Sequence, residues 1–89
     1  MEDFGNNIKL KDGKLFPLIS YSYGNYGALI LQIEAESLFD VVMDFNRNNT
    51  DVITINIEGE EPILVYGYQN IAFVSTVYNG VKIALEKDN

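Results

Sequence analysis

The sequence contains no histidine and no cysteine. Histidine is the commonest general base and a frequent metal ligand, so its absence removes the usual Ser-His and Cys-His nucleophilic arrangements. Without cysteine the chain has neither a disulfide framework nor a thiolate metal site, which fits a reduced compartment. These two absences argue against an enzyme, and we expect no catalytic residue, no metal site and no cofactor.

Long apolar runs and clusters of basic residues are also missing. The apolar stretches are only a few residues long, whereas a membrane-spanning helix needs about 20 residues, so we expect no membrane segment. The start Met1-Glu2-Asp3 is acidic, with no basic or apolar region behind it, so we expect no signal peptide. With 6 basic and 13 acidic residues, the chain lacks the basic stripe that binds phosphate backbones. Direct binding of nucleic acid is therefore disfavoured.

The acidic residues are concentrated in one part of the chain. The window from Glu34 to Glu61 holds eight acidic residues and one basic residue, Arg47, and so carries the whole net charge of −7. Two explanations stay open: the charge keeps a strand-rich chain soluble, or it attracts a basic partner. Glu58, Glu60 and Glu61 are the candidate partner contacts of this window. Their spacing matches no ordered Ca²⁺ or Mg²⁺ loop, so a solvated acidic turn is favoured over a metal site.

The most unusual composition lies between Ser20 and Gly27, which reads SYSYGNYG. Binding loops are rich in these residue types, because tyrosine offers a rigid amphipathic ring while serine, glycine and asparagine adapt to the partner. The alternative is a strand end and a glycine-rich turn whose tyrosines are half-buried for packing. On the binding interpretation, the candidate contacts are the tyrosines of this loop and of the later strands, namely Tyr21, Tyr23, Tyr26, Tyr66, Tyr68 and Tyr78.

Two dipeptides predict hairpins. Asp12-Gly13 and Asn79-Gly80 each stand between alternating runs, and such pairs favour type I′ turns, in which both central residues have positive φ. Pro17 lies in the return arm of the first hairpin. Because proline cannot donate to a β ladder, we expect that arm to be an edge strand or to be bent at Pro17.

One helix is predicted to begin after Ser37. The Ser37 hydroxyl can accept from the amide of Asp40, whose carboxylate complements the positive end of the helix dipole. Asp40, Asp44 and Arg47 are expected to face away from the core, and the polar run 46–50 to end the helix. The buried stripe is formed by apolar residues at three- and four-residue spacing: Leu38, Val41, Val42 and Phe45. Because the two adjacent valines are weak helix formers, a strand is the alternative.

Three further alternating runs predict strands at 28–35, 51–58 and 63–68. Together with the two hairpins they predict a single α+β domain, 1–89, with loose ends at 1–6 and 87–89. The expected element order is ββ-β-α-β-β-ββ. This order indicates a mainly antiparallel sheet or a small open barrel with one covering helix.

The order of these motifs resembles that of small uncharacterised proteins encoded among the tail-region genes of prophages in Gram-positive bacteria. The resemblance covers about residues 7–86, and the motifs that carry it are Ile8-Lys9-Leu10, Asp12-Gly13, Ser37-Leu38 with Phe45, Ile53-Thr54-Ile55, Gly67-Tyr68 and Val81-Lys82-Ile83. It implies no site residue, because that family has no assigned site.

The resemblance and the composition together suggest a non-enzymatic phage or prophage protein that acts by protein–protein contact, as a small tail- or baseplate-associated component. Its expected location is the phage particle or the cytoplasm of the bacterial host. Its expected partner is a particle component, a host defence protein or further copies of itself. The alternative is an anti-defence inhibitor of the anti-CRISPR kind, whose acidic surface imitates nucleic acid and blocks a host nuclease. An enzyme that uses a pair of carboxylates is the third and least favoured hypothesis.

Overall fold

The computed structural model describes residues 5–48 and 52–87, which form one seven-stranded antiparallel sheet and one α-helix. The elements along the chain are β1 (Asn7–Lys9), β2 (Leu15–Tyr23), the short 3-10 turn η1 (Asn25–Gly27), β3 (Leu29–Ile33), α1 (Leu38–Asn48), β4 (Val52–Asn56), β5 (Ile63–Tyr66), β6 (Asn70–Val77) and β7 (Gly80–Glu86). The prediction of an α+β fold with one covering helix, in the order ββ-β-α-β-β-ββ, is confirmed. The segment with two adjacent valines is helical.

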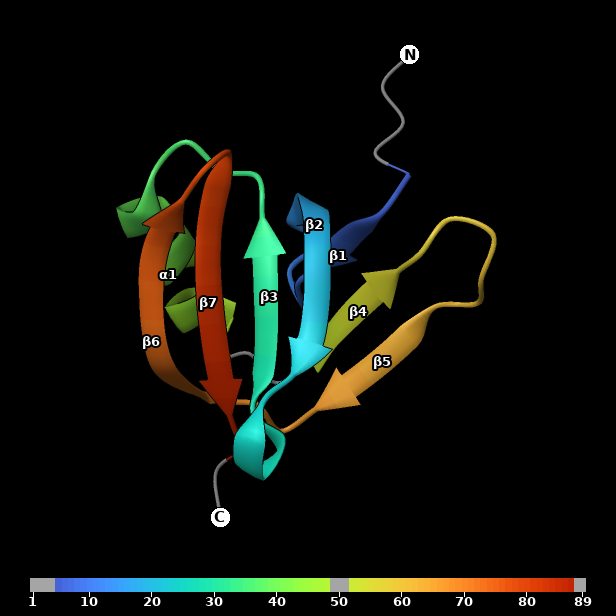
Figure 1. Cartoon of the computed structure of the whole chain (residues 1–89). Helices are drawn as coiled ribbons and strands as arrows, with labels where there is room; N and C mark the ends of the chain where they lie inside the picture. Colours follow the sequence, from blue (N-terminus) through green and yellow to red (C-terminus); the bar gives the residue numbers. More distant parts are fainter. Residues whose placement is uncertain (1–4, 49–51, 88–89) are drawn as a thin grey trace.

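Strand β2 joins the two halves of the sheet. The strand order is β5-β4-β1-β2-β3-β7-β6, and Figure 1 shows β4 and β5 tilted away from the upright β3, β7 and β6. The first part of β2 pairs with β1 as far as Pro17, whereas the part from Leu18 to Tyr23 pairs with β3. The prediction of an edge strand at Pro17 is therefore wrong, because β2 is central. The alternative of a bend agrees with the change of partner and with a register shift between Leu18 and Ser20.

Pro17 is tolerated in a central strand because β2 changes partners beside it. The Leu18 amide donates to the Asn6 carbonyl at 2.9 Å on the β1 side of the strand. The Glu34 amide donates to the Pro17 carbonyl at 2.9 Å on the β3 side. The N–H that proline lacks thus falls where one ladder ends and the next begins, and the carbonyl of the same residue is still used.

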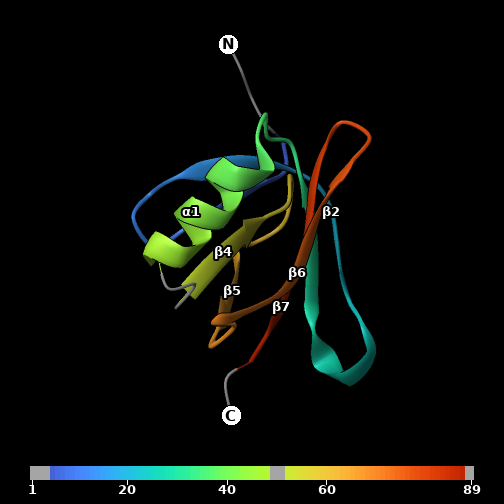
Figure 2. The ribbon, with the colours of Figure 1, turned by 90° about the vertical axis from the view of Figure 1, so that its left-hand side faces the viewer.

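The core lies between the sheet and α1, which covers one face of the sheet (Figure 2). Phe45 of the helix and Phe16 of β2 are both buried, and their rings stack with centroids 6.1 Å apart. Alternate strand positions and their flanks supply the remaining aliphatic core, namely Ile8, Leu10, Leu18, Leu29, Leu31, Ile33, Ile53, Ile55, Val81, Ile83 and Leu85. This period of two is what one buried sheet face requires.

The helix begins as predicted, but one residue that was expected to face solvent, Asp44, is buried. The Asp40 amide donates to the Ser37 hydroxyl at 3.3 Å, which confirms the cap. Asp44 was expected to face away from the core, yet it is only 8% exposed. Its carboxylate pairs with Arg47 one turn later and with the Lys14 ammonium at 3.6 Å, at the start of β2. This ion-paired contact joins α1 to the β1–β2 hairpin.

Both hairpin turns differ from the type I′ prediction. In the first, the Gly13 amide donates to the Leu10 carbonyl at 2.9 Å, and Gly13 has φ +96° while the φ of Asp12 is not positive. The connection is therefore a three-residue loop with glycine in the left-handed position, another common hairpin form. In the second, Val77 pairs with Gly80, so the turn consists of Tyr78 and Asn79, and only Asn79, at φ +75°, is left-handed.

Gly80 belongs to β7, and glycine is required at this position for a reason other than turn geometry. A Cβ on Gly80 would lie 2.0 Å from the carbonyl oxygen of Ile33 and 3.0 Å from its carbonyl carbon. Only glycine fits, because the backbone at the end of β3 passes directly over this position.

The strand predicted for 63–68 is shorter in the structure than expected. It ends at Tyr66, so Tyr68 is not in a strand with Tyr66 but follows Gly67, which has φ +82°.

Among the described residues, none of the helices is long and apolar enough to span a membrane. The predicted loose ends and the loop before β4 contain residues outside the described ranges, namely 1–4, 88–89 and 49–51, the last including Asp51.

Candidate interaction surface

Tyr21 and Tyr23 stand on the face of β2 that continues the core. Tyr21 pairs with Leu31 and Tyr23 with Leu29, two buried residues of β3, so both tyrosines belong to the same sheet face as these leucines. Tyr21 is half-buried and packs against the core, whereas Tyr23 is 53% exposed. Their rings meet edge to face with centroids 6.4 Å apart. This pair extends the apolar face of the sheet to its rim.

The loop after β2 presents Tyr26 to solvent. The Gly24 amide donates to the Ala28 carbonyl at 2.8 Å and closes the loop. Tyr26 has φ +65°, a left-handed conformation that costs a residue with a side chain roughly 1–2 kcal/mol. Its side chain is fully exposed, at 106% of the reference area. Because Tyr26 is strained and contributes no burial, its presence is not explained by stability.

Gly24 directs this loop over the outer face of the sheet, the face away from α1. A Cβ on Gly24 would lie 2.9 Å from Cδ1 of Ile30, whose neighbours Leu29 and Leu31 face the core. The loop therefore packs on Ile30 from the outer side. Figure 2 agrees, since the segment around η1 leans away from the helix.

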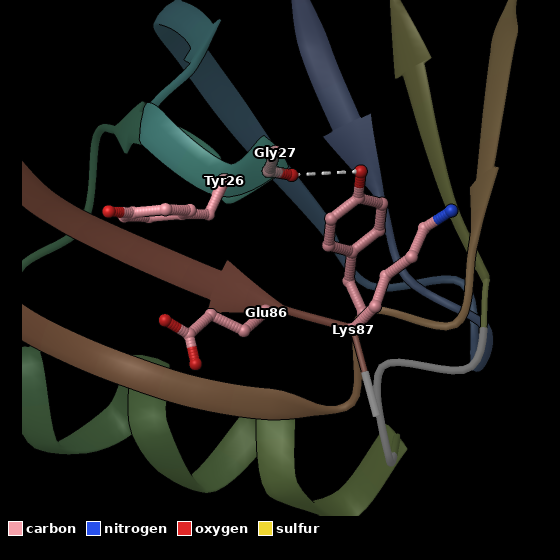
Figure 3. Close-up of a pocket in the computed structure, with 5 residues that line it drawn as sticks. Tyr26, Gly27, Glu86 and Lys87 are labelled. Carbon is pink, nitrogen blue, oxygen red and sulfur yellow. Dashed lines mark hydrogen bonds between the residues drawn. The ribbon is translucent and has the colours of Figure 1, made fainter. Parts of the chain in front are cut away.

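Tyr68 anchors the same loop through a hydrogen bond to Gly27. It is buried, at 7% exposure, and its hydroxyl donates to the carbonyl oxygen of Gly27 at 3.3 Å. The ammonium of Lys87 lies 5.4 Å from the centre of the Tyr68 ring, which is a cation–π contact. Around these groups is an open hollow of about 530 Å³ lined by Tyr26, Gly27, Tyr68, Glu86 and Lys87, drawn in Figure 3.

The fold alters the ionisation of the Tyr23 phenol. Partial burial raises the pKa of Tyr23 above its ordinary value of 10.0, and the neighbouring phenols of Tyr68 and then Tyr21 raise this pKa further. Tyr21, Tyr23 and Tyr26 lie on β2 and the loop that follows it, and Tyr68 is hydrogen-bonded to Gly27 of that loop. Tyr21, Tyr23, Tyr26 and Tyr68 thus form one cluster, which we call the tyrosine end.

The two remaining tyrosine candidates are placed differently. Tyr66 is 61% exposed at the end of β5, and β5 runs toward the tyrosine end (Figure 1). It pairs with Val52, so it stands on the outer face, whereas its neighbour Val65 packs against the core. Tyr78 is 91% exposed in the β6–β7 turn, at the opposite end of the sheet from η1. The fold therefore separates Tyr78 from the tyrosine end.

The acidic candidates gather at that opposite end. The Glu58 amide donates to the Asn6 side-chain oxygen at 2.9 Å. The carbonyl of Asn6 accepts from the Leu18 amide, and the carbonyl of the preceding residue, Pro17, accepts from the Glu34 amide. Glu58 and Glu34 are thereby about three strand spacings apart, on the order of 14 Å. The exposed carboxylates of this region, which we call the acidic end, are Glu34, Glu36, Asp40, Glu58, Glu60 and Glu61. Buried Asp44 is not among them.

Sequence reasoning missed Glu86 and Lys87, which complete the tyrosine end. Glu86 ends β7 and Lys87 follows it, and neither carries a local motif, so only the antiparallel pairing of β7 with β3 brings them beside η1. Within residues 5–48 and 52–87, no group of three or more acidic side chains is arranged to hold a metal ion. The three glutamates of the β4–β5 turn are exposed to solvent.

The chain was compared with protein-family models, with curated proteins and with solved structures, and no match was found. The interpretation of the two ends therefore depends on their geometry and chemistry.

Proposed function

We propose that this chain is a non-enzymatic binding protein that acts by protein–protein contact through its tyrosine end. The observation that carries the proposal is Tyr26, a fully exposed aromatic side chain on a left-handed residue. Strained residues are kept where they serve function, and tyrosine is enriched among the residues that dominate binding energy at interfaces. The loop that carries Tyr26 is anchored at Gly27 by a hydrogen bond from buried Tyr68, which lowers the backbone entropy lost on binding.

The biological setting that we propose follows the resemblance described above. The protein is a small phage or prophage component, associated with the tail or baseplate, and it resides in the phage particle or the host cytoplasm. Among the residues that the structure describes, β5 and β6 are the edge strands of the sheet, and an edge strand can pair with a strand of a neighbouring molecule, which supports assembly into a larger body. The absence of histidine and cysteine from the sequence supports a role without catalysis.

The test is retention of a partner by matched variants. Purified protein is immobilised and exposed to disrupted phage particles and to a lysate of a prophage-carrying bacterium, and retained proteins are identified by mass spectrometry. We expect a partner that is retained by the wild type and by Tyr78→Ala but lost with Tyr26→Ala. Both tyrosines are nearly fully exposed, so neither change removes core packing. Equal retention by all three proteins would exclude the tyrosine end as the contact.

A second function is favoured by the acidic end, where six exposed carboxylates gather in a chain that carries a net charge of −7. In this alternative the protein is an anti-defence inhibitor whose acidic end imitates nucleic acid and occupies the basic groove of a host nuclease. Such an inhibitor competes with DNA, and its affinity falls steeply as salt rises because exposed charges are screened. Charge reversal at Glu58, Glu60 and Glu61 should abolish the competition, while Tyr26→Ala should leave it unchanged.

A further inference from the structure

The hollow at the tyrosine end has two chemically different sides. Figure 3 shows the Tyr26 ring and the Glu86 carboxylate extending to one side, while the side chain of Lys87 lies on the other. The Tyr68 ring is on the side of Lys87, whose ammonium lies 5.4 Å from the ring centre. All of them line the same hollow of about 530 Å³. The side with Tyr26 and Glu86 therefore offers an aromatic face and a negative charge.

The other side of the hollow is already occupied by a contact of the protein itself. The Lys87 ammonium lies 5.4 Å from the centre of the Tyr68 ring, and the Tyr68 hydroxyl is used by Gly27. This pair shows that the hollow can seat a cation against an aromatic ring. Within the described residues, no ion pair or hydrogen bond engages the Glu86 side chain, and the Tyr26 ring has no aromatic neighbour.

We propose that the space between Tyr26 and Glu86 receives an arginine side chain from a basic segment of the partner protein, an inference that rests on the proposed function. A guanidinium is planar and stacks on an aromatic face, and its fork of donors matches a carboxylate. One arginine can therefore satisfy the ring and the carboxylate together. Glu86 is exposed to solvent, so a segment of the partner can bring its arginine to this carboxylate.

Other occupants fit this side of the hollow less well. An anion would meet the Glu86 carboxylate, and the one cation in the hollow, Lys87, is already seated on Tyr68. An apolar group would remove the solvent from Glu86 without pairing its charge, which is costly. A lysine ammonium can pair with Glu86 but cannot stack as a plane on Tyr26.

The probe is a capped pentapeptide, Gly-Gly-Arg-Gly-Gly, with its citrulline and lysine counterparts as matched peptides. Citrulline keeps the planar shape of arginine and removes its charge. Backbone amide shifts of the full chain are followed by NMR during titration. We expect saturable shifts centred on Gly27 and Glu86 with the arginine peptide, and binding about tenfold weaker with citrulline, the loss of one charge-assisted contact. The lysine peptide should bind between these two.

Variants of exposed residues complete the test. Tyr26→Ala and Glu86→Gln should each weaken binding of the arginine peptide at least about tenfold, as loss of an interface anchor does, while Tyr26→Phe keeps the ring and should retain binding. Tyr78→Ala, at the opposite end, should have no effect. Equal binding of the citrulline peptide, or shifts centred on the acidic end, would overturn the inference. If a protein partner is retained through Tyr26 while the arginine peptide does not bind, the inference fails and the proposed function stands. If no partner is retained in a Tyr26-dependent way, the proposed function fails by itself.

Discussion

The Tyr68 hydroxyl donates a hydrogen bond at 3.3 Å to the carbonyl oxygen of Gly27, which lies 41 residues earlier in the chain. Tyr68 comes from the segment between β5 and β6, and Gly27 closes the turn that presents Tyr26. The contact therefore connects the two halves of the sheet at the tyrosine end. Buried Tyr68 thereby stabilises the loop that presents the exposed Tyr26.

Replacing Tyr68 with Phe removes this hydrogen bond and keeps the ring beneath Lys87. We expect the free energy of unfolding to fall by about 1 kcal/mol, the usual net value of one hydrogen bond. Hydrogen exchange of the Gly24 amide, which bonds to Ala28 within the same loop, should become faster. Urea unfolding and exchange measured by NMR provide the two readouts. Tyr66→Phe is the control, because the Tyr66 side chain is exposed; an equal loss in both variants would contradict the prediction.

Gly80→Ala is expected to be among the most damaging single substitutions. The new Cβ would lie 2.0 Å from the Ile33 carbonyl oxygen, which is backbone and cannot rotate away. The β3–β7 pairing must then separate locally, at a cost of about 3 kcal/mol or more. Thermal and urea unfolding measure the loss.

Gly59→Ala is the matched control for this prediction. Gly59 has φ +83° and no atom within 4 Å of its added Cβ, so only backbone strain is introduced, about 1–2 kcal/mol. A larger loss at Gly59 than at Gly80 would mean that the close approach of β3 is not the reason for glycine at position 80.

The comparison of these two glycines shows why sequence patterns predicted the fold better than its details. Alternation and the Ser37 cap depend on neighbours in sequence, and they predicted the seven strands and the helix correctly. The glycine of Asn79-Gly80 was assigned to turn conformation, whereas its position depends on Ile33, a residue of another hairpin. A dipeptide cannot reveal a contact made 47 positions away.

The candidate site shows the same contrast between features set by neighbours in sequence and features set by distant contacts. Tyr26 was a candidate contact from the composition of its own loop, with half-buried packing as the alternative. The burial of Tyr68 depends on Gly27 and on the end of β7. Glu86 and Lys87 enter the site only through sheet pairing. Asp44 was predicted to be solvated from the helix pattern alone, although the β1–β2 hairpin lies against that side of α1.

Asp44→Ala should weaken the connection between α1 and this hairpin. The Asp44 carboxylate pairs with Lys14 and Arg47, and its side chain is only 11% exposed. Losing this largely buried charged acceptor removes its charge-assisted contacts with Arg47 and Lys14, which costs about 1–3 kcal/mol of unfolding free energy. Glu60→Ala, in an exposed turn, should change stability by no more than about 0.5 kcal/mol. Urea unfolding compares the two, and similar losses would mean that the ion pairs contribute nothing beyond surface charge.

The phenol of Tyr23 should ionise only above its ordinary pKa of 10.0, because burial and the Tyr68 and Tyr21 phenols disfavour its phenolate. The folded state therefore holds this proton more tightly than the unfolded chain does. The resulting stability is fully present below about pH 10 and is lost as the pH rises through the raised pKa. Titration of the Tyr23 ring carbon by NMR measures this pKa. Tyr68→Phe should lower it toward 10.0, whereas an unchanged value would mean that Tyr68 does not act on Tyr23.

Tyr26→Gly should increase stability while it weakens binding. Glycine adopts φ +65° without strain, which recovers roughly 1–2 kcal/mol, and its greater freedom in the unfolded chain takes back about 0.5–1 kcal/mol. The net gain is therefore about 0.5–1 kcal/mol, which urea unfolding can resolve. Asn79→Gly is the control, because Asn79 has a similar φ of +75° but asparagine tolerates this conformation better. Its gain should be smaller.

A gain in stability at Tyr26 combined with lost retention of the partner is what a residue kept for function should give, because selection then tolerates a cost to the fold. If Tyr26→Gly instead destabilises the protein, the ring contributes to folding. Its exposure would then have to be explained without a partner.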